Sequence, residues 1–541
     1  MLKRMTVFYA LVLCIAAALF FRIYYLTSGD ALRMAASTQS GYTLKVLDER
    51  GTIYDSRFQR LTNQGERYIA AVMPCPQALS ALSERLTGER RAQMIESFQN
   101  NRPFLIEVPD KHIYAYGVDI FTAHSRYSED QPAAHIVGHL QDGAGIYGIE
   151  KAYDSILHAC GSKAEIRYTV DAHGTALHNI PPAIQEENSA EGVVLTLDLD
   201  IQKAAEEVAS YYIHKGAVVV MDVETGDIIA SVSLPDFDPN DLAGALQAEG
   251  QPFLNRVFCA YNVGSTFKLL TAACALDSGI SESLGYECTG AIEIAGVRFR
   301  CHKQAGHSWL TMQRAIEQSC NPYFINLGQK LSPQKLLELC GAAGLSRQVK
   351  LAPQLLSAAG TLPEPEELES RAALANFSFG QGSLTATPLQ IAQIISCIAN
   401  GGQAVTPRLV AGATTDGVTL SDENPNAAPV QIISPQAASI LRRMMISTVE
   451  KGSGTAAKPD FGSAGGKTAS AQTGTYGEDG REIVHAWFSG FYPAQNPKYA
   501  IVVLNENGNS GGAVAAPVFR GLANAIRDIE RARLRMEKNA D

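Results

Sequence analysis

The sequence GSTFK, Gly264 to Lys268, is followed directly by the apolar run Leu269–Leu276 and then by Gly279. Residues three apart share one face of a helix, so the hydroxyl of Ser265 and the amine of Lys268 are expected to meet. The apolar run predicts a buried helix, and burial lowers the pKa of a lysine toward a value that suits a base. A helix N-terminus also favours negative charge developing on the serine. The stretch therefore predicts an activated serine nucleophile.

This spacing is a weak signal when it occurs alone. Ser332, Pro333, Gln334 and Lys335 have the same spacing, but there the proline predicts an ordinary N-cap of an exposed helix. A second motif, Ser319-Cys320-Asn321, interrupts the helical patterns Met312–Gln318 and Pro322–Leu327. We expect it on a tight loop that aims side chains into a cleft, although a plain turn between helices has the same pattern.

A third motif lies on a predicted strand and reads Gly465, Gly466, Lys467, Thr468, Ala469, Ser470. Its small residues let a substrate backbone pair with the strand edge, while Lys467 and Thr468 can bind a carboxylate. The order S-x-x-K, S-x-N, K-T-x is the set found in penicillin-recognising enzymes, and together the three motifs are specific.

The strands expected around these motifs predict an α+β fold. A hairpin is predicted first and three strands much later, with a largely helical stretch between them: Ala217–Met221, Ile228–Val232, Gly466–Thr473, His485–Phe491 and Tyr499–Leu504. Amphipathic helices are expected at Asp200–His214 and from Pro517. We expect an antiparallel sheet built from both ends of this region, with helices on its faces and a helical insert.

The N-terminus carries a predicted membrane anchor. Lys3 and Arg4 precede an apolar run, and the span Thr6–Leu26 is long enough to cross a bilayer. A cleaved signal peptide is the alternative, but no A-x-A-like site follows the run. The basic N-terminus predicts that this end stays in the cytoplasm and that the bulk of the chain lies outside.

Charge and cysteine content argue against a nucleic-acid-binding protein and against a disulfide-rich one. The net charge of -10 in 541 residues is spread along the chain, which argues against a nucleic-acid partner. Ten cysteines without any C-x-x-C pair do not make a disulfide scaffold. Cys288, Cys301, His302 and His307 are ligand types for zinc, but their spacing fits no structural zinc pattern, so no metal is expected.

The whole chain resembles the class B penicillin-binding proteins. Arg50–Asp55 resembles the pedestal motif of that family and Gly148–Glu150 its G-x-E partner segment, so Arg50 and Glu150 are expected to pair. Further landmarks are Asn255–Arg256, Phe379–Gly382 and Trp487. The resemblance implies a serine β-lactamase-like transpeptidase fold behind a transmembrane helix and an elongated mixed pedestal. The expected division is 1–27 as cytoplasmic stub and transmembrane helix, 28–192 as pedestal, with Gln77–Asn100 helical and Pro181–Gly192 a boundary or long hairpin, 193–535 as transpeptidase domain and 536–541 as tail.

The resemblance also implies a role for each motif residue. Ser265 is the nucleophile and Lys268 its base, Ser319 and Asn321 relay protons and contact the substrate amide, and Lys467 with Thr468 holds the carboxylate. Backbone amides of Ser265 and Ser470 form the oxyanion hole. Ala469 departs from the family, which usually has glycine there, and a methyl group at this position is expected to crowd the substrate.

The implied reaction cross-links peptidoglycan stem peptides through an acyl-enzyme, without a cofactor, and β-lactams acylate the same serine. A polytopic glycan polymerase is the implied membrane partner. A membrane-anchored β-lactamase or β-lactam sensor, and a non-enzymatic cell-wall scaffold, are the alternatives. Finally, Cys320 lies inside the S-x-N motif and Cys301 in a loop before it, so we predict a reversible Cys301–Cys320 disulfide, with Cys288 as the rival partner.

Overall fold

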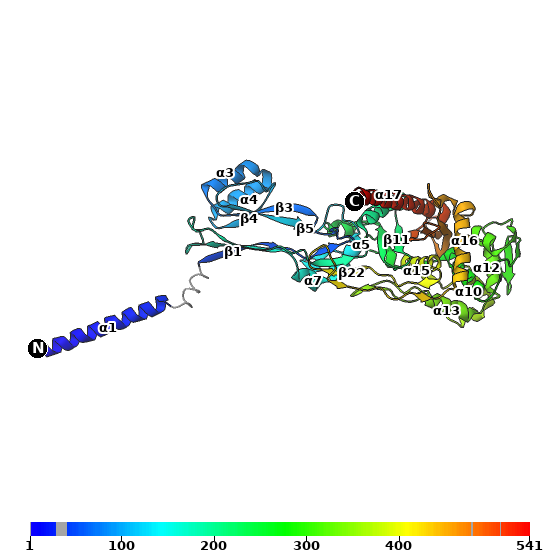
Figure 1. Ribbon diagram of the computed structural model, residues 1–541, viewed down its shortest axis with the longest axis horizontal. Helices are drawn as coiled ribbons and strands as arrows, with labels where there is room; N and C mark the ends of the chain where they lie inside the picture. Colours follow the sequence, from blue (N-terminus) through cyan, green and yellow to red (C-terminus); the bar gives the residue numbers. More distant parts are fainter. Residues whose placement is uncertain (1, 29–39, 478–479, 509, 541) are drawn as a thin grey trace. The chain divides into compact units, whose positions relative to one another are not determined.

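The computed structural model describes residues 2–28, 40–477, 480–508 and 510–540 (Figure 1). The chain forms two compact units, the first made of Met1–Arg50, Asn63–Arg126 and Cys160–Ser189, the second of Gly51–Thr62, Tyr127–Ala159 and Ala190–Asp541. Two segments expected within the pedestal, 51–62 and 127–159, thus belong to the second unit.

Backbone pairing explains why residues 51–62 join the second unit. Strand β2, Thr52–Tyr54, pairs in parallel with β10, Gly192–Leu195, and β10 also pairs with β22, Val410–Thr414. The carboxylate of Asp55 accepts a hydrogen bond from the backbone amide of Leu199 at 3.0 Å. Arg50 falls in the first unit and Glu150 in the second, and their pairing stays a prediction.

The predicted apolar N-terminal segment forms one helix, α1, Leu2–Ser28. Within it, Lys3–Tyr25 is long and apolar enough to cross a membrane. The large apolar side chains of this stretch are exposed, for example Phe20 and Phe21 at 72% and 74%. Such a surface is stable only in an apolar surrounding, so α1 has the length and composition of a membrane anchor.

The first unit contains two three-stranded antiparallel sheets. One has the order β1-β8-β9 and the other β4-β3-β5. Ala71 of β3 packs with apolar residues of β1 and β8, whereas Ala70 and Val72 point to the opposite face. Two helices, α3 and α4, cover that face (Figure 1). The bounds are β1 Gly41–Asp48, β3 Gly65–Val72, β4 Phe104–Val108, β5 Val118–Ser125, β8 Lys163–Thr169, β9 Ala183–Glu187, α3 Pro76–Arg85 and α4 Gly88–Gln99.

The helix expected over Gln77–Asn100 is wrong as one element, because the chain breaks between α3 and α4. Leu86 is extended and Gly88 has φ +58°, in the left-handed region that glycine adopts readily. The stretch Pro181–Gly192 does contain a hairpin strand, because β9 pairs with β8 in antiparallel fashion.

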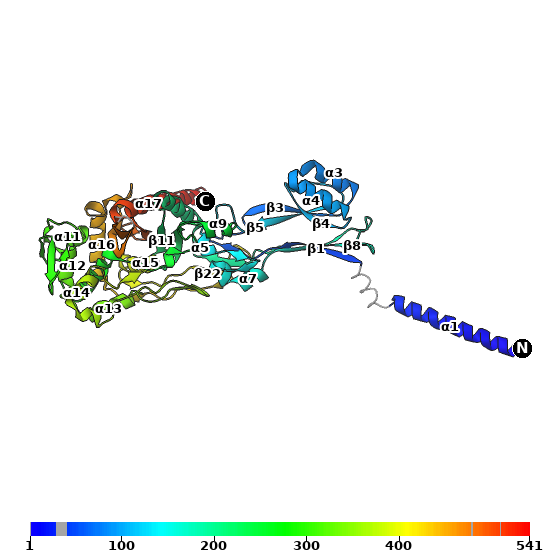
Figure 2. The same cartoon turned by 180° about the vertical axis from the view of Figure 1, so that it is seen from behind.

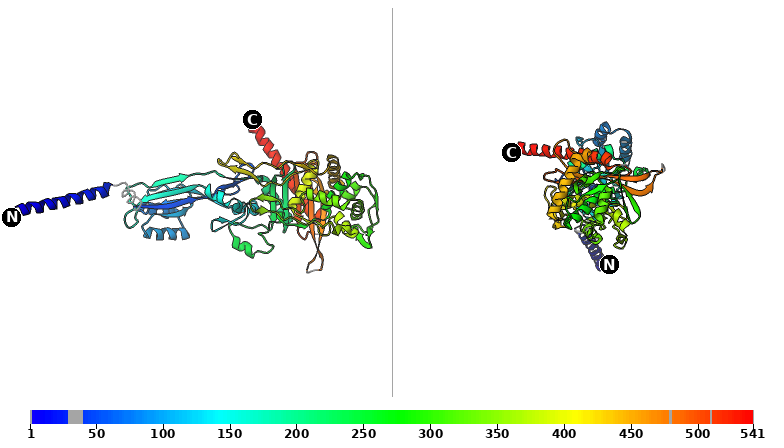
Figure 3. Two further views of the ribbon diagram at one scale, coloured as in Figure 1. Left: turned by 90° about the horizontal axis from the view of Figure 1, so that it is seen from below. Right: turned by 90° about the vertical axis from the view of Figure 1, so that its right-hand side faces the viewer.

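The second unit is built around a five-stranded antiparallel sheet with the order β12-β11-β27-β26-β25. Its strands come from both ends of the region, which confirms the predicted architecture. At one edge of the sheet, the β25–β26 hairpin, drawn in orange, extends past the neighbouring strands (Figure 3). The bounds are β11 Gly216–Asp222, β12 Ile228–Leu234, β25 Gly465–Tyr476, β26 Glu482–Tyr492 and β27 Tyr499–Asn505.

Helices cover both faces of this sheet. In β11, Val218 and Val220 pack with the helices α8, Leu199–Tyr212, and α17, Ala516–Ala540. Ala217 and Val219 alternate to the other face and join the core that contains α15, Pro388–Ala399. Figure 2 shows α17 and α15 on opposite sides of β11. Helix α17 continues through residues 536–540, which the sequence placed in a tail.

The helical insert and two small hairpins complete the unit and carry the candidate site. Ser332 accepts a hydrogen bond from the backbone amide of Lys335 and caps α13, so its predicted structural role is confirmed. The bounds are α10 Lys268–Asp277, α11 Met312–Glu317, α12 Asn321–Gly328, α13 Pro333–Ala342, α14 Arg371–Ser378, α16 Pro435–Lys451, β14 Tyr286–Cys288, β15 Ala291–Ile294, β16 Val297–Arg300 and β17 Ser308–Leu310.

Candidate active site

Ser265 lies on a single 3-10 turn, Gly264–Phe267, that leads into α10. Lys268 is the first residue of α10 and is fully buried. Its Nζ lies 3.0 Å from Ser265 Oγ, which is the contact that the spacing predicts. Sequence placed the serine at the start of the helix, and the structure places it one turn earlier.

Two glycines let the backbone approach Ser265 closely. Gly264 donates a hydrogen bond to the Gly380 carbonyl at 3.0 Å, and a Cβ on Gly380 would lie 1.9 Å from the Gly264 oxygen. A Cβ on Gly264 would come within 3.0 Å of the Ala471 side chain on β25. The serine turn therefore sits directly against the strand that carries Ser470.

The S-x-N loop joins α11 to α12 and brings its polar groups to Lys268. The Lys268 amine donates to the Ser319 carbonyl oxygen at 2.8 Å and to Asn321 Oδ1 at 2.6 Å. It also lies 3.2 Å from Ser319 Oγ. Ser319 has φ +52°, a left-handed conformation that is uncommon for serine. Ser319 and Cys320 precede the helix, whereas Asn321 is its first residue.

Lys467 of β25 approaches the same hydroxyl from the other side. Its Nζ lies 2.9 Å from Ser319 Oγ and donates to the Thr468 carbonyl oxygen at 2.8 Å. Burial lowers the pKa of Lys268 to about 7. Burial first, and then the charge of Lys268, holds the pKa of Lys467 well below its usual value. Two buried amines around one hydroxyl disfavour double protonation, which leaves a lone pair available near neutral pH.

The acceptors around Lys268 indicate where that lone pair points. The Ser319 carbonyl oxygen and Asn321 Oδ1 can only accept hydrogen bonds, so they take the two N–H groups of a neutral amine. The remaining position faces hydroxyl groups, which can donate. The geometry therefore suits a base that accepts the proton of Ser265.

Thr468 and Ala469 occupy different faces of β25. Thr468 Oγ1 lies 2.8 Å from Ser453 Oγ at the cleft. Ala469 also borders the cleft, but it is only 3% exposed and its methyl group packs in the hydrophobic core. It pairs across the sheet with Trp487. The expectation that this methyl group crowds a substrate therefore has no support in the position of the side chain.

An open cleft of about 590 Å³ contains these groups, and its lining includes residues that the sequence did not single out. Ser453 follows α16 in a glycine-flanked turn, and no motif marks it as functional. The lining residues are Ser265, Arg300, Cys301, His302, Gln318, Ser319, Asn321, Ser453, Thr468, Ala469, Ser470, Gln472, Val484, Ser510 and Gly512.

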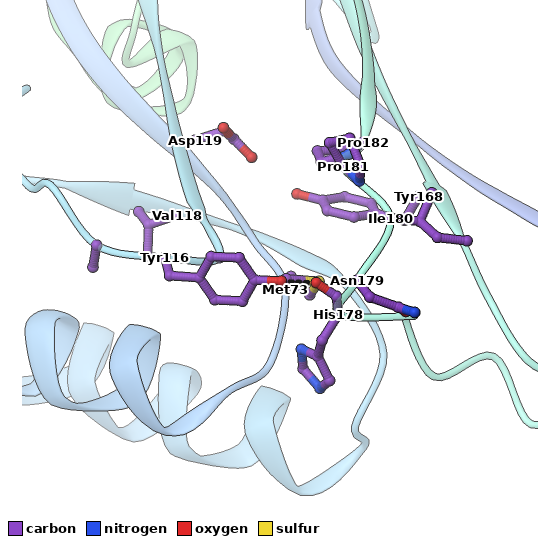
Figure 4. Close-up of a pocket in the computed structure, with 12 residues that line it drawn as sticks. Met73, Tyr116, Val118, Asp119, Tyr168, His178, Asn179, Ile180, Pro181 and Pro182 are labelled. Carbon is purple, nitrogen blue, oxygen red and sulfur yellow. Dashed lines mark hydrogen bonds between the residues drawn. The ribbon is translucent and has the colours of Figure 1, made fainter.

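A second pocket, of about 400 Å³, lies within the first unit (Figure 4). The Tyr116 hydroxyl donates to the His178 carbonyl oxygen at its edge, and Pro181 and Pro182 close one side. Its lining contains neither serine nor lysine nor cysteine. Its lining therefore lacks a serine–lysine pair like that of Ser265 and Lys268.

The structure also brings together cysteines near the S-x-N loop. Sulfur atoms of Cys288, Cys301 and Cys320 and a ring nitrogen of His307 all lie within 4.8 Å of one another. Throughout the described residues the cysteines are free thiols. The Cys301–Cys320 disulfide stays a prediction, and the two sulfur atoms are close neighbours.

A serine beside a buried base, at the edge of an antiparallel sheet and in an open polar cleft, defines a serine acyltransferase site. The sequence matches the penicillin binding protein transpeptidase domain over residues 216–524, and the chain belongs to this family. More narrowly, its relatives make it a class B penicillin-binding protein.

Two curated relatives and one solved structure illustrate the similarity. The chain is 31% identical over 418 residues to stage V sporulation protein D of Bacillus subtilis, an alignment that spans 73% of this chain and 62% of that protein. It is 30% identical over 433 residues to the peptidoglycan D,D-transpeptidase PbpA of Mycolicibacterium smegmatis, and this alignment spans 74% of this chain and 84% of that protein. The structure of the penicillin G acyl-enzyme complex of penicillin-binding protein A from M. tuberculosis is 25% identical in sequence to this chain. The two structures superpose with a TM-score of 0.64 over 89% of this chain and 100% of that chain.

Proposed function

We propose that this chain is a peptidoglycan D,D-transpeptidase that forms its acyl-enzyme on Ser265. One observation carries the proposal: the buried amine of Lys268 lies within hydrogen-bond distance of Ser265 Oγ, Ser319 Oγ and Asn321 Oδ1 at once. This is the arrangement that a nucleophile, its base and a proton relay require.

In the first step, Ser265 Oγ attacks the carbonyl carbon of a D-Ala-D-Ala amide and its proton passes to Lys268. The C–N bond then breaks, and the leaving D-alanine nitrogen takes a proton by way of the Ser319 hydroxyl, which lies between the two lysine amines. Backbone amides of Ser265 and Ser470 stabilise the oxyanion. The products are an ester on Ser265 and free D-alanine.

In the second step, an amine from a neighbouring glycan strand attacks the ester carbonyl. The new amide bond forms as the Ser265 C–O bond breaks, and the amine proton returns to the serine oxygen through Lys268. Neither step requires an oxidant or a cofactor. A β-lactam enters by the same attack, which opens its ring and leaves a covalent adduct on Ser265.

The terminal carboxylate of the stem peptide orients the substrate in the cleft. Lys467 is fully buried and directs its amine to Ser319, so direct contact with the carboxylate falls to the Thr468 hydroxyl at the cleft. The positive charge of Lys467 lies behind that contact whenever its amine is protonated.

The anchor suggests where the reaction occurs. Lys3 and Arg4 lie in the first turn of α1, ahead of its apolar stretch, which supports a cytoplasmic N-terminus and a catalytic unit outside the membrane. We assign the first unit to the pedestal and propose a polytopic glycan polymerase as membrane partner. That partner would supply the glycan strands that this site cross-links.

The test uses the full-length chain in detergent, a stem peptide that ends in D-Ala-D-Ala and an amine acceptor. We expect release of D-alanine together with a cross-linked product, both lost in Ser265→Ala. Ser332→Ala, in the other S-x-x-K sequence, should keep both. A penicilloyl adduct that hydrolyses rapidly, without any cross-linked product, would instead identify a β-lactamase.

A further inference from the structure

Three cysteines and one histidine from separate segments meet beside the S-x-N loop. Cys288 ends strand β14, Cys301 follows strand β16, His307 precedes strand β17, and Cys320 caps helix α12. One potential ligand atom of each lies within 4.8 Å of the other three. In the described part of the chain, no other cysteines gather in this way with a histidine.

We propose that these four side chains bind one structural zinc ion. Structural zinc sites are closed and tetrahedral, commonly with Cys3His ligands at about 2.3 Å for sulfur and about 2.0 Å for nitrogen. Tetrahedral geometry at those lengths places sulfur ligands about 3.8 Å apart. The four ligand atoms, which lie within 4.8 Å of one another, are therefore no more than about 1 Å further apart than the sulfur ligands of such a site. Thiolate-rich sets select zinc over the oxygen-seeking calcium and magnesium ions.

The backbone around the cluster is already fixed in place. The amide of His307 donates to the Cys288 carbonyl oxygen at 3.0 Å, and the amide of Cys301 donates to Gly290 at 2.9 Å. A Cβ on Gly290 would lie 1.9 Å from the Gln304 carbonyl oxygen. These close approaches hold the two loops around a preformed set of ligands, which lowers the ordering cost of binding an ion.

The closeness of the sulfur atoms to one another and to His307, rather than burial alone, distinguishes the cluster from other buried cysteines. Cys288, Cys301 and Cys320 are at most 3% exposed, yet their sulfur atoms face one another and His307. Single buried cysteines such as Cys397 pack as small apolar side chains. The predicted Cys301–Cys320 disulfide uses two of the same sulfur atoms, so a bridge and a bound ion exclude each other. Zinc accounts for all four residues, whereas the disulfide accounts for two.

The position of Cys320 links the ion to the catalytic loop. Its neighbours Ser319 and Asn321 both contact the Lys268 amine, and Ser319 has the uncommon φ of +52°. Such a conformation costs on the order of 1–3 kcal/mol and persists where its surroundings fix it. A metal bond at Cys320 fixes this loop. This consequence rests on the proposed function, whereas zinc binding itself does not.

The experiment measures zinc per chain in the full-length protein, purified in detergent with reductant and dialysed against metal-free buffer. We expect about one zinc per chain. Cys288→Ser and His307→Ala should lose it. His302→Ala and Cys397→Ser are the matched controls and should keep it, because the His302 nitrogen lies 4.0 Å from Cys301 Sγ but outside the set of four.

Cobalt exchange into the wild-type chain keeps the test independent of variant folding. A tetrahedral thiolate site should give intense visible bands and sulfur-to-cobalt charge transfer. Wild-type protein that binds neither ion, or variants of Cys288 and His307 with full zinc, would overturn the site. In a parallel preparation without reductant, zinc-free protein whose non-reduced digests contain a Cys301–Cys320 peptide would also overturn it. If the loop depends on the ion, removal of zinc by a chelator should slow penicillin acylation by up to about 100-fold. The zinc content of the protein tests the site independently of the reaction that Ser265 performs.

Discussion

The rate of acylation of Ser265 by a penicillin should follow the charge of Lys268. Only the neutral amine accepts the serine proton, and burial lowers its pKa from 10.5 to about 7. Below this value the neutral fraction falls tenfold for each pH unit, so about one amine in 100 is neutral near pH 5. Acylation near pH 5 should therefore be about 100-fold slower than on the plateau above pH 7 or so.

The matching substitution is Lys268→Arg, which keeps a positive charge but cannot lose its proton. A general base contributes about 10²- to 10⁴-fold, and the variant should lose acylation by a factor in that range at every pH. Lys335→Arg is the control. Lys335 also follows a serine by three residues, but it is exposed on α13, so its replacement should leave the rate unchanged.

The assay follows covalent labelling by a fluorescent penicillin over time, with the full-length chain in detergent at constant ionic strength. Circular dichroism at each pH confirms that the fold is intact. A rate that stays constant from about pH 5 to about pH 9 would refute the role assigned to the buried amine. So would a midpoint near the usual pKa of lysine, or Lys268→Arg protein that labels like wild type.

Three further predictions concern the loop, the serine turn and topology. Ser319→Ala should slow acylation by about 10²-fold or more, measured with the same label, because its hydroxyl bridges both lysines. Gly380→Ala should lower the thermal unfolding midpoint far more than Gly279→Ala, since both have positive φ but only the first would clash, 1.9 Å from Gly264. Protease added to intact spheroplasts should digest most of the chain, and complete protection would exclude the proposed orientation.

The sequence predicted the central sheet well because each strand carried a local signal. The hairpin of β11 and β12 has a turn sequence between alternating runs, and α8 and α17 have clear apolar faces. The break between α3 and α4 was missed because a single glycine is tolerated in many helices, whereas the extended backbone of Leu86 and Thr87, which ends α3 before Gly88 begins α4, has no clear mark in the sequence. Residues 51–62 join the second unit through pairing with β10, which is far away in sequence.

The same distinction applies to the site. Ser265 and Lys268 were found because their contact is set by helix geometry over three residues. Ser453 was missed because its contact with Thr468 exists only in the folded chain. Cys288 and Cys320 belong to elements that meet only through tertiary packing, so spacing alone gave no sign of the proposed zinc site.

Covalent labelling at Ser265 tests the central claim most directly. The full-length chain is incubated with a penicillin, digested and mapped by peptide mass spectrometry. The adduct should appear on the peptide that contains Ser265, should be absent from Ser265→Ala protein, and should persist in Ser332→Ala protein as the matched control. An adduct of equal yield in Ser265→Ala protein, or wild-type protein that remains unmodified while folded, would contradict the account.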